Sequence, residues 1–331
     1  MLALVDRVGL ELERILCPRP APTAAPRGQA ETKGKIEAAY AVVAAAAAKG
    51  KPALAYSGGS DSVALLELAV RAGLRPTIIW ADTGMEYPET RAFVQEQAAA
   101  YGLELRIAKA PRTPIEQWQK TGWPFLGKMA ARNWTMLHAN AGFALNCSEC
   151  CRSMKIGPAR KLTKNLGCTV QLTGQRGRDD RVRGMRNALE GPLAWQDRDR
   201  LWIANPLAGW TDQDVEAYAR EHNLPEHPAK ARGAATIGCV FCGGGSQFEN
   251  SGIRILRETW PEAWDRLIVE WGGGAIILAI KYGVRLEVAL AAIKELGGLE
   301  QLATERPWIF DFTRLTPRAG YAKGARPARS L

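Results

Sequence analysis

Short apolar stretches alternate with longer helical stretches between residues 50 and 176, and this alternation limits the fold more than any other feature of the chain. The predicted elements, in chain order, are a strand at 53–56, a helix at 61–72, a strand at 77–84, a helix at 89–101, and strands at 103–108 and 169–176. Such alternation is typical of parallel strands joined by crossover helices, with a ligand site at the carboxyl ends of the strands. We therefore predict an α/β fold with a doubly wound, mostly parallel sheet.

The sheet-forming region is flanked by two segments of different character. Residues 1–33 contain a short helix with amphipathic spacing and a proline-rich linker, which we interpret as a docking element for a partner. Residues 34–258 form the predicted main domain, which begins with a second helix at about 34–49 and includes a later helix capped by Thr211. Residues 259–331 are predicted to form a helical C-terminal region that ends in a basic tail.

Composition argues against a membrane protein. The chain has 331 residues, 47% of them hydrophobic, and can bury a large core. Its longest apolar runs are shorter than the roughly 20 residues that a bilayer span requires, and acidic residues interrupt its apolar N-terminal stretch. We therefore expect a cytoplasmic protein without a membrane partner. The net charge of +10 favours a polyanionic partner, nucleic acid or nucleotide, over an ordinary solvated surface.

A glycine-rich loop follows the first predicted strand directly. Residues Ser57–Ser62 read SGGSDS and stand between that strand and the helix at 61–72. Glycines let the backbone approach a ligand closely, and the N–H groups at a helix N-terminus attract anions. The loop lacks the Gly-Lys-Ser/Thr ending of the common nucleoside-triphosphatase loop. We interpret it as a phosphate-binding loop, with a surface turn as the alternative.

This loop resembles the SGGxDS loop of the ATP pyrophosphatase (PP-loop) superfamily, whose fold is adenine nucleotide α-hydrolase-like. In that superfamily the loop holds the pyrophosphate end of ATP, or a sulfate or phosphate group in the reductase relatives. The resemblance implies that the nucleotide is bound by Ser57, Gly58, Gly59, Ser60, Asp61 and Ser62. It also implies catalytic roles for Ser60 and Asp61, with Asp61 orienting the loop or positioning Mg²⁺.

Further motifs resemble the phosphoadenylyl-sulfate (PAPS) reductase family over roughly residues 50–260. The family segments DTGxxFxET, G-x-R-x-x-E/D and P-x-x-x-W-T-x-x-D-V are matched by WADTGMEYPET, TGQRGRDD and NPLAGWTDQDV, with Tyr87 replacing the phenylalanine. The resemblance adds to the nucleotide-binding residues Asp82, Thr83, Gly84, Gly174, Arg176, Arg181 and Arg183. Arg176 is also a candidate catalytic residue because its planar guanidinium suits phosphate or sulfate. A helix or turn cap for Asp82 and a solvated charge run for Arg176, Arg181 and Arg183 are the alternatives.

Two cysteine clusters are the third chemical feature. Cys147, Cys150 and Cys151 lie in NCSECCRSMKIGP, and Cys239 and Cys242 lie in GCVFC. Two close-spaced clusters far apart in sequence are what a four-thiolate metal site requires. They are similar to the CC-x-x-x-K-V-x-P and C-x-x-C ligands of the adenylyl-sulfate (APS) reductases, which implies a 4Fe–4S cluster. The fourth ligand is open between Cys147 and Cys151, and zinc in two C-x-x-C knuckles is the alternative.

The motifs described so far do not include the cysteine nucleophile that sulfonucleotide reduction requires. Sulfonucleotide reductases attack the substrate sulfur with a cysteine thiolate in a C-terminal E-C-G-L-H segment, whereas residues 243–331 contain no cysteine. The combination of loop and cluster resembles the DndC- and SspD-like sulfurtransferases of DNA phosphorothioation. Our leading hypothesis is therefore an ATP pyrophosphatase that adenylates an oxygen of DNA for replacement by sulfur.

This hypothesis implies several partners and leaves two alternatives. The cofactors are ATP, Mg²⁺ and the iron–sulfur cluster, and the expected partners are DNA, a cysteine desulfurase or other persulfide donor, and further DNA-modification subunits. One alternative is an APS or PAPS reductase that releases sulfite with Cys147 or Cys151 as the thiol. The other is a nucleic-acid-binding module with structural zinc and a degenerate loop.

Overall fold

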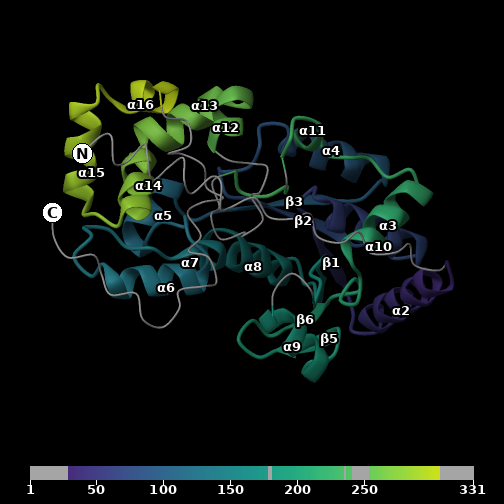
Figure 1. Cartoon of the computed structure of the whole chain (residues 1–331). Coiled ribbons are helices and arrows are strands. Elements are labelled where there is room, and N and C mark those ends of the chain that lie inside the picture. Colours follow the sequence, from purple (N-terminus) through teal and green to yellow (C-terminus); the bar gives the residue numbers. More distant parts are fainter. Residues whose placement is uncertain (1–28, 178–180, 235, 241–252, 306–331) are drawn as a thin grey trace. The chain divides into compact units, whose positions relative to one another are not determined.

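The computed structural model describes residues 29–177, 181–234, 236–240 and 253–305 (Figure 1). The chain divides into two compact units, Met1–Ile36 and Glu37–Leu331, and the site described below lies in the second. The predicted helix at 2–16, the proline-rich linker and the basic tail lie outside the described residues.

The strands of the described residues form one six-stranded sheet in the order β3-β2-β1-β4-β6-β5. Their bounds are β1 (Pro52–Ala55), β2 (Thr77–Asp82), β3 (Leu105–Lys109), β4 (Val170–Leu172), β5 (Leu193–Gln196) and β6 (Leu201–Ala204). Neighbouring strands are parallel except for β5 and β6, which pair in an antiparallel manner. This arrangement confirms the predicted α/β fold with a mostly parallel sheet.

Helices occupy the connections and the C-terminal region. The first group is α2 (Gln29–Ala47), α3 (Ser60–Arg71), α4 (Thr90–Ala100), α5 (Pro114–Thr121), α6 (Lys128–Leu137), α7 (Cys147–Cys151), the π-helical turn η1 (Arg152–Ile156), α8 (Gly157–Asn165) and α9 (Arg181–Glu190). The second group is α10 (Asp212–Glu221), α11 (Pro228–Ala231), α12 (Ile253–Thr259), α13 (Pro261–Trp264), the π-helical turn η2 (Asp265–Glu270), α14 (Gly273–Tyr282), α15 (Leu286–Glu295) and α16 (Leu299–Glu305). No helix of the described ranges is long and apolar enough to cross a bilayer.

The strand order places the glycine loop at the point where the sheet reverses direction. The chain runs from β1 outward to β2 and β3, and then returns to β4 on the other side of β1. Because parallel crossovers are right-handed, this reversal puts α3 and α4 on one face and α8 on the other. Leu162 of α8 and Leu166, the residue that follows this helix, pack against Ala53, Ile79 and neighbouring apolar side chains of the sheet. Ligands of doubly wound sheets bind at such a reversal, beyond the carboxyl ends of the strands.

One element boundary differs from the sequence prediction, and one predicted helix cap is observed. The strand predicted at 169–176 ends at Leu172, where its partner β6 also ends, and the Thr173 N–H makes the last bond between them, to the Ala204 carbonyl. The chain then passes Asp61 so closely that a Cβ on Gly174 would lie 3.1 Å from the Asp61 carbonyl carbon. The predicted cap of α10 is confirmed, since the Thr211 hydroxyl accepts the Asp214 N–H and the Asp214 carboxylate accepts the Thr211 N–H.

A second apolar cluster joins α5–η1 with the C-terminal helices. Trp118 of α5 and Trp264 of α13 are its largest fully buried side chains. Cys150 and Met154 belong to the same cluster, and Cys239 packs against it. The predicted helical C-terminal region is therefore present between residues 253 and 305, and it packs on the segment that carries the first cysteines (Figure 1).

Candidate functional site

The glycine loop turns from β1 directly into α3 and is braced by its own hydroxyl groups. The Ser62 Oγ donates to the Gly59 carbonyl at 2.8 Å and lies 3.2 Å from the Ser57 Oγ. The Ser57 N–H donates to the Ser62 Oγ at 3.3 Å. The first helical bond of α3 runs from the Val63 N–H to Gly59, so the N–H groups before Val63 at the helix start have no partner within the helix. These amides give the loop the polarity of an anion site.

Gly58 cannot be replaced without disturbing the loop. Its φ of +80° lies in the left-handed region that favours glycine. A Cβ at this position would lie 3.1 Å from His227 Cδ2 and 3.2 Å from Phe93 Cδ1. The rings of Phe93 and His227 are in contact, with centroids 4.9 Å apart. The loop therefore rests on a packed pair of rings that leaves no space for a side chain.

His227 is a buried, neutral support of this loop. Its Nδ1 accepts the Ala229 N–H at 3.1 Å, so its Nε2 carries the proton and donates to the Thr90 Oγ1 at 3.1 Å. Burial lowers the pKa of His227 below its ordinary value, and the nearby Glu89 carboxylate only partly opposes this.

A loss of stability on acidification follows from the lowered pKa of His227. The unfolded chain takes up a proton near pH 6.5, whereas the folded imidazole stays neutral to lower pH, so the unfolded state is favoured as the pH falls through this window. We expect denaturant midpoints to drop between about pH 7.5 and 5.5. The His227→Asn variant keeps an acceptor for the Ala229 N–H and should show a smaller drop. An equal drop in both proteins would assign the pH dependence to other groups.

Arg176 lies beside the loop and is held by two carboxylates. Its Nε lies 3.3 Å from Asp61 Oδ1, and an Nη atom lies 2.7 Å from Asp212 Oδ1. The Arg176 side chain is only 13% exposed, whereas that of Asp212 is 84% exposed. The structure thus brings the three predicted residues Asp61, Gly174 and Arg176 together. In this arrangement the Asp61 carboxylate engages a guanidinium, and Mg²⁺ binding by Asp61 stays a prediction.

Replacing Arg176 with lysine should weaken nucleotide binding although the charge is kept. An ammonium group lacks the planar fork that reaches Asp61 and Asp212 at once and that suits an oxyanion. We expect the KM for the nucleotide to rise by about tenfold, with a smaller change in kcat. The control is Arg71→Lys, which alters an ion pair with Glu67 in the last turn of α3. Equal KM values for the two variants would remove Arg176 from the binding site.

The turn after β2 holds the next predicted residues. Asp82 pairs with Arg91 at 2.5 Å and accepts the Gly84 N–H at 3.2 Å, so in this structure it acts as a cap and ion-pair partner. The Thr83 hydroxyl donates to Glu86 Oε1 at 2.6 Å and lies 3.6 Å from Cys239 Sγ. Burial raises the pKa of Glu86, and hydrogen bonds from Thr83 and the charge of Lys155 limit the rise.

The second cysteine segment lies against both the glycine loop and this turn. Ile237 is the neighbour of Gly59, where a Cβ would lie 3.6 Å from the Ile237 Cβ. Cys239 forms an antiparallel bridge with Glu86, and the Val240 N–H donates to the Met85 carbonyl at 2.7 Å. The segment therefore crosses the carboxyl ends of β1 and β2, although it lies more than 150 residues further along the chain.

The first cysteine segment forms the short helix α7. Asn146 caps α7 by accepting the Glu149 N–H at 3.1 Å, and the Asn146 N–H bonds to the Trp123 carbonyl at 3.0 Å. Cys150 is buried and accepts the Trp118 Nε1–H at 3.3 Å, whereas Cys151 is exposed and Cys147 is half-buried. An N–H group aimed at a buried sulfur is the kind of contact that stabilises a metal-bound thiolate.

These contacts fit a shared metal site without completing one. Cys150 belongs to the apolar cluster of α5–η1 and the C-terminal helices, and Cys239 packs against the same cluster. Both cysteine segments therefore reach one region. No group of three or more His, Cys, Asp or Glu side chains gathers around a common point among the described residues. Cys242 lies outside them, and so do the side chains of Arg181 and Arg183. The four-thiolate site stays a prediction.

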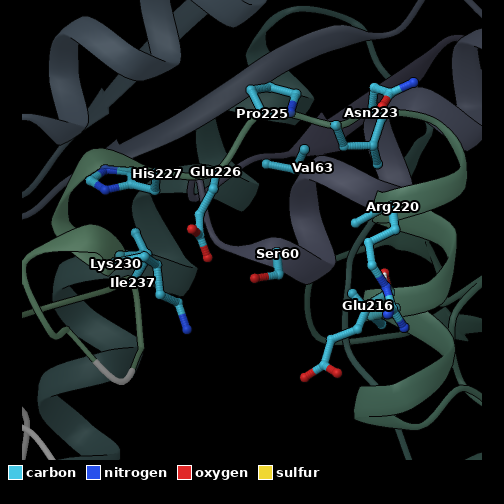
Figure 2. Close-up of a pocket in the computed structure, with 14 residues that line it drawn as sticks. Ser60, Val63, Glu216, Arg220, Asn223, Pro225, Glu226, His227, Lys230 and Ile237 are labelled. Atoms are coloured by element: carbon cyan, nitrogen blue, oxygen red, sulfur yellow. Dashed lines mark hydrogen bonds between the residues drawn. The ribbon is translucent and has the colours of Figure 1, made fainter.

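A cavity of about 570 Å³ opens beside the loop between α3, α10 and α11 (Figure 2). Figure 2 shows three side chains pointing into it, Ser60 from the start of α3 and Glu226 and Lys230 from the segment 226–230. Glu216 and Arg220 of α10 line the opposite wall. Among the glycine-loop residues, Ser60 thus faces open space, whereas Ser57 and Ser62 brace the loop.

Sequence reasoning did not single out several residues of this site. His227, Glu226 and Lys230 belong to EHPAK, a segment without a chemical motif of its own. Glu86 lies inside a recognised motif. Its contact with Cys239 depends on the packing of two segments that are far apart in the sequence. Only His227 could have been noticed from the sequence, as a helix cap, because it precedes a proline and proline favours the first position of a helix.

Comparisons with known proteins match part of the chain to one family and to several relatives. The family described as Phosphoadenosine phosphosulfate reductase domain matches residues 51–244. A phosphoadenosine 5'-phosphosulfate reductase of Alkalilimnicola ehrlichii is 27% identical over 191 residues, which cover 58% of this chain and 69% of the relative. An adenosine 5'-phosphosulfate reductase of Deinococcus radiodurans is 30% identical over 183 residues, which cover 55% of this chain and 62% of the relative.

Among solved structures, a PAPS reductase of Candida auris in a phosphate complex is 20% identical, with a TM-score of 0.43, and covers 66% of this chain and 98% of that chain. The names of the relatives agree better with sulfonucleotide reduction, the alternative hypothesis above, than with DNA phosphorothioation.

Proposed function

The chain belongs to the phosphoadenosine phosphosulfate reductase domain family, and on this premise we propose that it reduces an adenosine sulfonucleotide to sulfite. The observation that carries the proposal is the contact of the cysteine segment with the loop: Ile237 lies against Gly59, and Cys239 lies 3.6 Å from Thr83. A phosphate-binding loop and a thiol-bearing segment thus share one edge of the sheet. Because a sulfonucleotide carries its sulfur on a phosphate, a phosphate in the loop brings that sulfur toward the cysteines.

Binding is assigned to the loop and the cavity beside it. The N–H groups at the start of α3 and the Arg176 guanidinium receive the phosphate and sulfate oxygens. The cavity of about 570 Å³ is large enough for a nucleoside. Lys230 supplies a cation there, and Glu226 an acceptor for hydroxyl or amino groups of the ligand.

The proposed chemistry is thiol attack on sulfur. A cysteine thiolate attacks the sulfur, the bond from sulfur to the phosphate oxygen breaks, and AMP or its 3'-phosphate leaves with the electron pair. A second thiol then attacks the sulfur of the modified cysteine, sulfite leaves, and a disulfide forms. A dithiol reductant restores the two thiols. Cys151 is the proposed nucleophile, because it is exposed whereas Cys150 is buried.

This assignment leaves four cysteines for a metal centre. Cys147 and Cys150 are one turn apart on one face of α7, and Cys239 and Cys242 come from the second segment. These four would hold the 4Fe–4S cluster, with zinc as the alternative. When bound, such a cluster supplies a redox-capable centre and a rigid link between the two cysteine segments.

The test is product analysis on anaerobically purified protein. The protein is incubated with adenylyl sulfate or its 3'-phosphate and a dithiol, and separately with ATP. Sulfite release from either sulfonucleotide is the expected result. Pyrophosphate release from ATP without sulfite from either compound would overturn the proposal.

A second candidate function is ATP-dependent sulfur transfer, and one observation favours it. Residues 243–331 contain no cysteine that could serve as a C-terminal nucleophile. In this reaction an oxygen of an acceptor such as DNA attacks the α-phosphate of ATP, pyrophosphate leaves, and sulfur from a desulfurase persulfide replaces the adenylated oxygen. Pyrophosphate release that increases when DNA and a desulfurase are added would support it.

A further inference from the structure

A second groove, of about 460 Å³, lies at the edge of the sheet, away from the cavity of Figure 2. One wall is the end of β3 with the residues that follow it, and the other is η1 with α8. Its described lining contains four cations and no carboxylate: Lys109, Arg112, Arg152 and Lys161. The cations stand on both walls, so an anion lying between them is approached from two sides.

The four cations are not neutralised equally by neighbouring acids. Arg152 forms an ion pair with Glu149, and Arg112 lies near Glu116, whose carboxylate caps α5. Within the described ranges, no carboxylate forms an ion pair with Lys109 or Lys161, and both side chains are exposed. The lysines thus provide the positive charge that a ligand would neutralise.

The groove floor differs from its rim. Ile107, Ala108 and Leu162 line it with two prolines, and Ser153 and Asn165 add neutral hydrogen-bonding groups. An apolar floor with a cationic rim suits a chain of sugars and phosphates, whose sugar faces are apolar and whose phosphates repeat along one edge. An acidic protein surface lacks this regular charge spacing.

The groove also lies near the edge of the sheet at which the glycine loop is found. Lys109 ends β3, which is two strands from β1 and hence roughly 10 Å from the start of the glycine loop. Arg152 and Ser153 follow Cys151 directly in the chain. The groove therefore lies beside the segment that carries Cys151.

We infer that this groove binds the sugar–phosphate backbone of a nucleic acid without reading its sequence. The inference concerns the groove alone, so it does not depend on which reaction the glycine loop supports. Its net positive lining agrees with the formal charge of +10 of the whole chain. Contacts to phosphates alone position a nucleic acid and carry no sequence information.

The test measures binding of a fluorescein-labelled DNA strand of about 20 nucleotides to the full chain, over salt concentrations of about 50–200 mM. The Lys109→Ala/Lys161→Ala variant should bind at least about tenfold more weakly, with a log–log salt slope smaller by about 2. The control is Lys164→Ala/Lys294→Ala, which removes the same charge from exposed positions that do not line the groove. The control should bind as the parent protein does.

Three results would overturn the inference. One is equal weakening in both double variants, which would mean that net charge alone matters. Another is displacement of the strand by inorganic tripolyphosphate at equal phosphate concentration, which would make the groove a site for free phosphates. The third is no binding by the parent protein. Sulfite release is assayed in parallel, and its absence from every protein would contradict the proposed function while leaving the groove supported.

Discussion

Replacing Gly58 with alanine should lower kcat/KM for the nucleotide reaction by about 100-fold, the loss expected when a binding group is displaced by about 1 Å. A methyl group at this position meets His227 and Phe93 at 3.1 and 3.2 Å. Both rings are buried, so the loop backbone has to move instead. The amides at the start of α3 then no longer point at the proposed phosphate position. Steady-state kinetics with the reactive nucleotide measures the effect.

Gly73 offers a matched control for this substitution. Its φ is also +80°, but no atom lies within 4 Å of a Cβ built there. In both variants the alanine has to adopt left-handed backbone, which lowers the free energy of unfolding by about 1–2 kcal/mol. Only Gly58→Ala also disturbs the loop. The thermal midpoint should fall in both proteins, and further in Gly58→Ala because of its contacts with the two rings, whereas activity should fall only in Gly58→Ala. Full activity in Gly58→Ala would separate the loop from catalysis.

The loop and the strands around it could be predicted from the sequence because their signals are local. Four short apolar runs, the glycines of Ser57–Ser62 and the Thr211 cap each act within a few residues of the chain. The observed strands agree with these predictions to within a few residues. The doubly wound sheet could also be predicted, and the structure adds that the chain returns after β3 to place β4 on the other side of β1.

The rest of the site depends on contacts between distant parts of the chain. Nothing in GCVFC indicates that Ile237 will lie on Gly59 or that Cys239 will pair with Glu86. The groove is invisible in sequence for the same reason, since Lys109 and Lys161 belong to separate elements without a motif. A local pattern can identify the residue types that a site needs, but only packing determines which of them meet.

Cys239→Ser should remove most of the iron from the anaerobically purified protein and reduce the reaction to background. Serine keeps the size of the side chain and its place beside Thr83, but an alcohol oxygen is a poor substitute for a thiolate at iron. The absorbance near 400 nm, iron and acid-labile sulfide should all fall together. If the site instead holds zinc, the parent protein is colourless and the variant loses zinc.

Cys168→Ser provides the control, because Cys168 is a buried thiol that belongs to neither cysteine segment. It is buried before β4 among the apolar side chains of the α8 face, and burial raises the pKa of its thiol, so it stays protonated. We expect this variant to keep its metal and its activity, at a cost of about 1–3 kcal/mol for a buried hydroxyl. Equal metal loss in the two variants would mean that the metal is lost through destabilisation of the fold. Loss from Cys239→Ser alone assigns this cysteine, which contacts Thr83 at the proposed nucleotide-binding edge, to the metal centre itself.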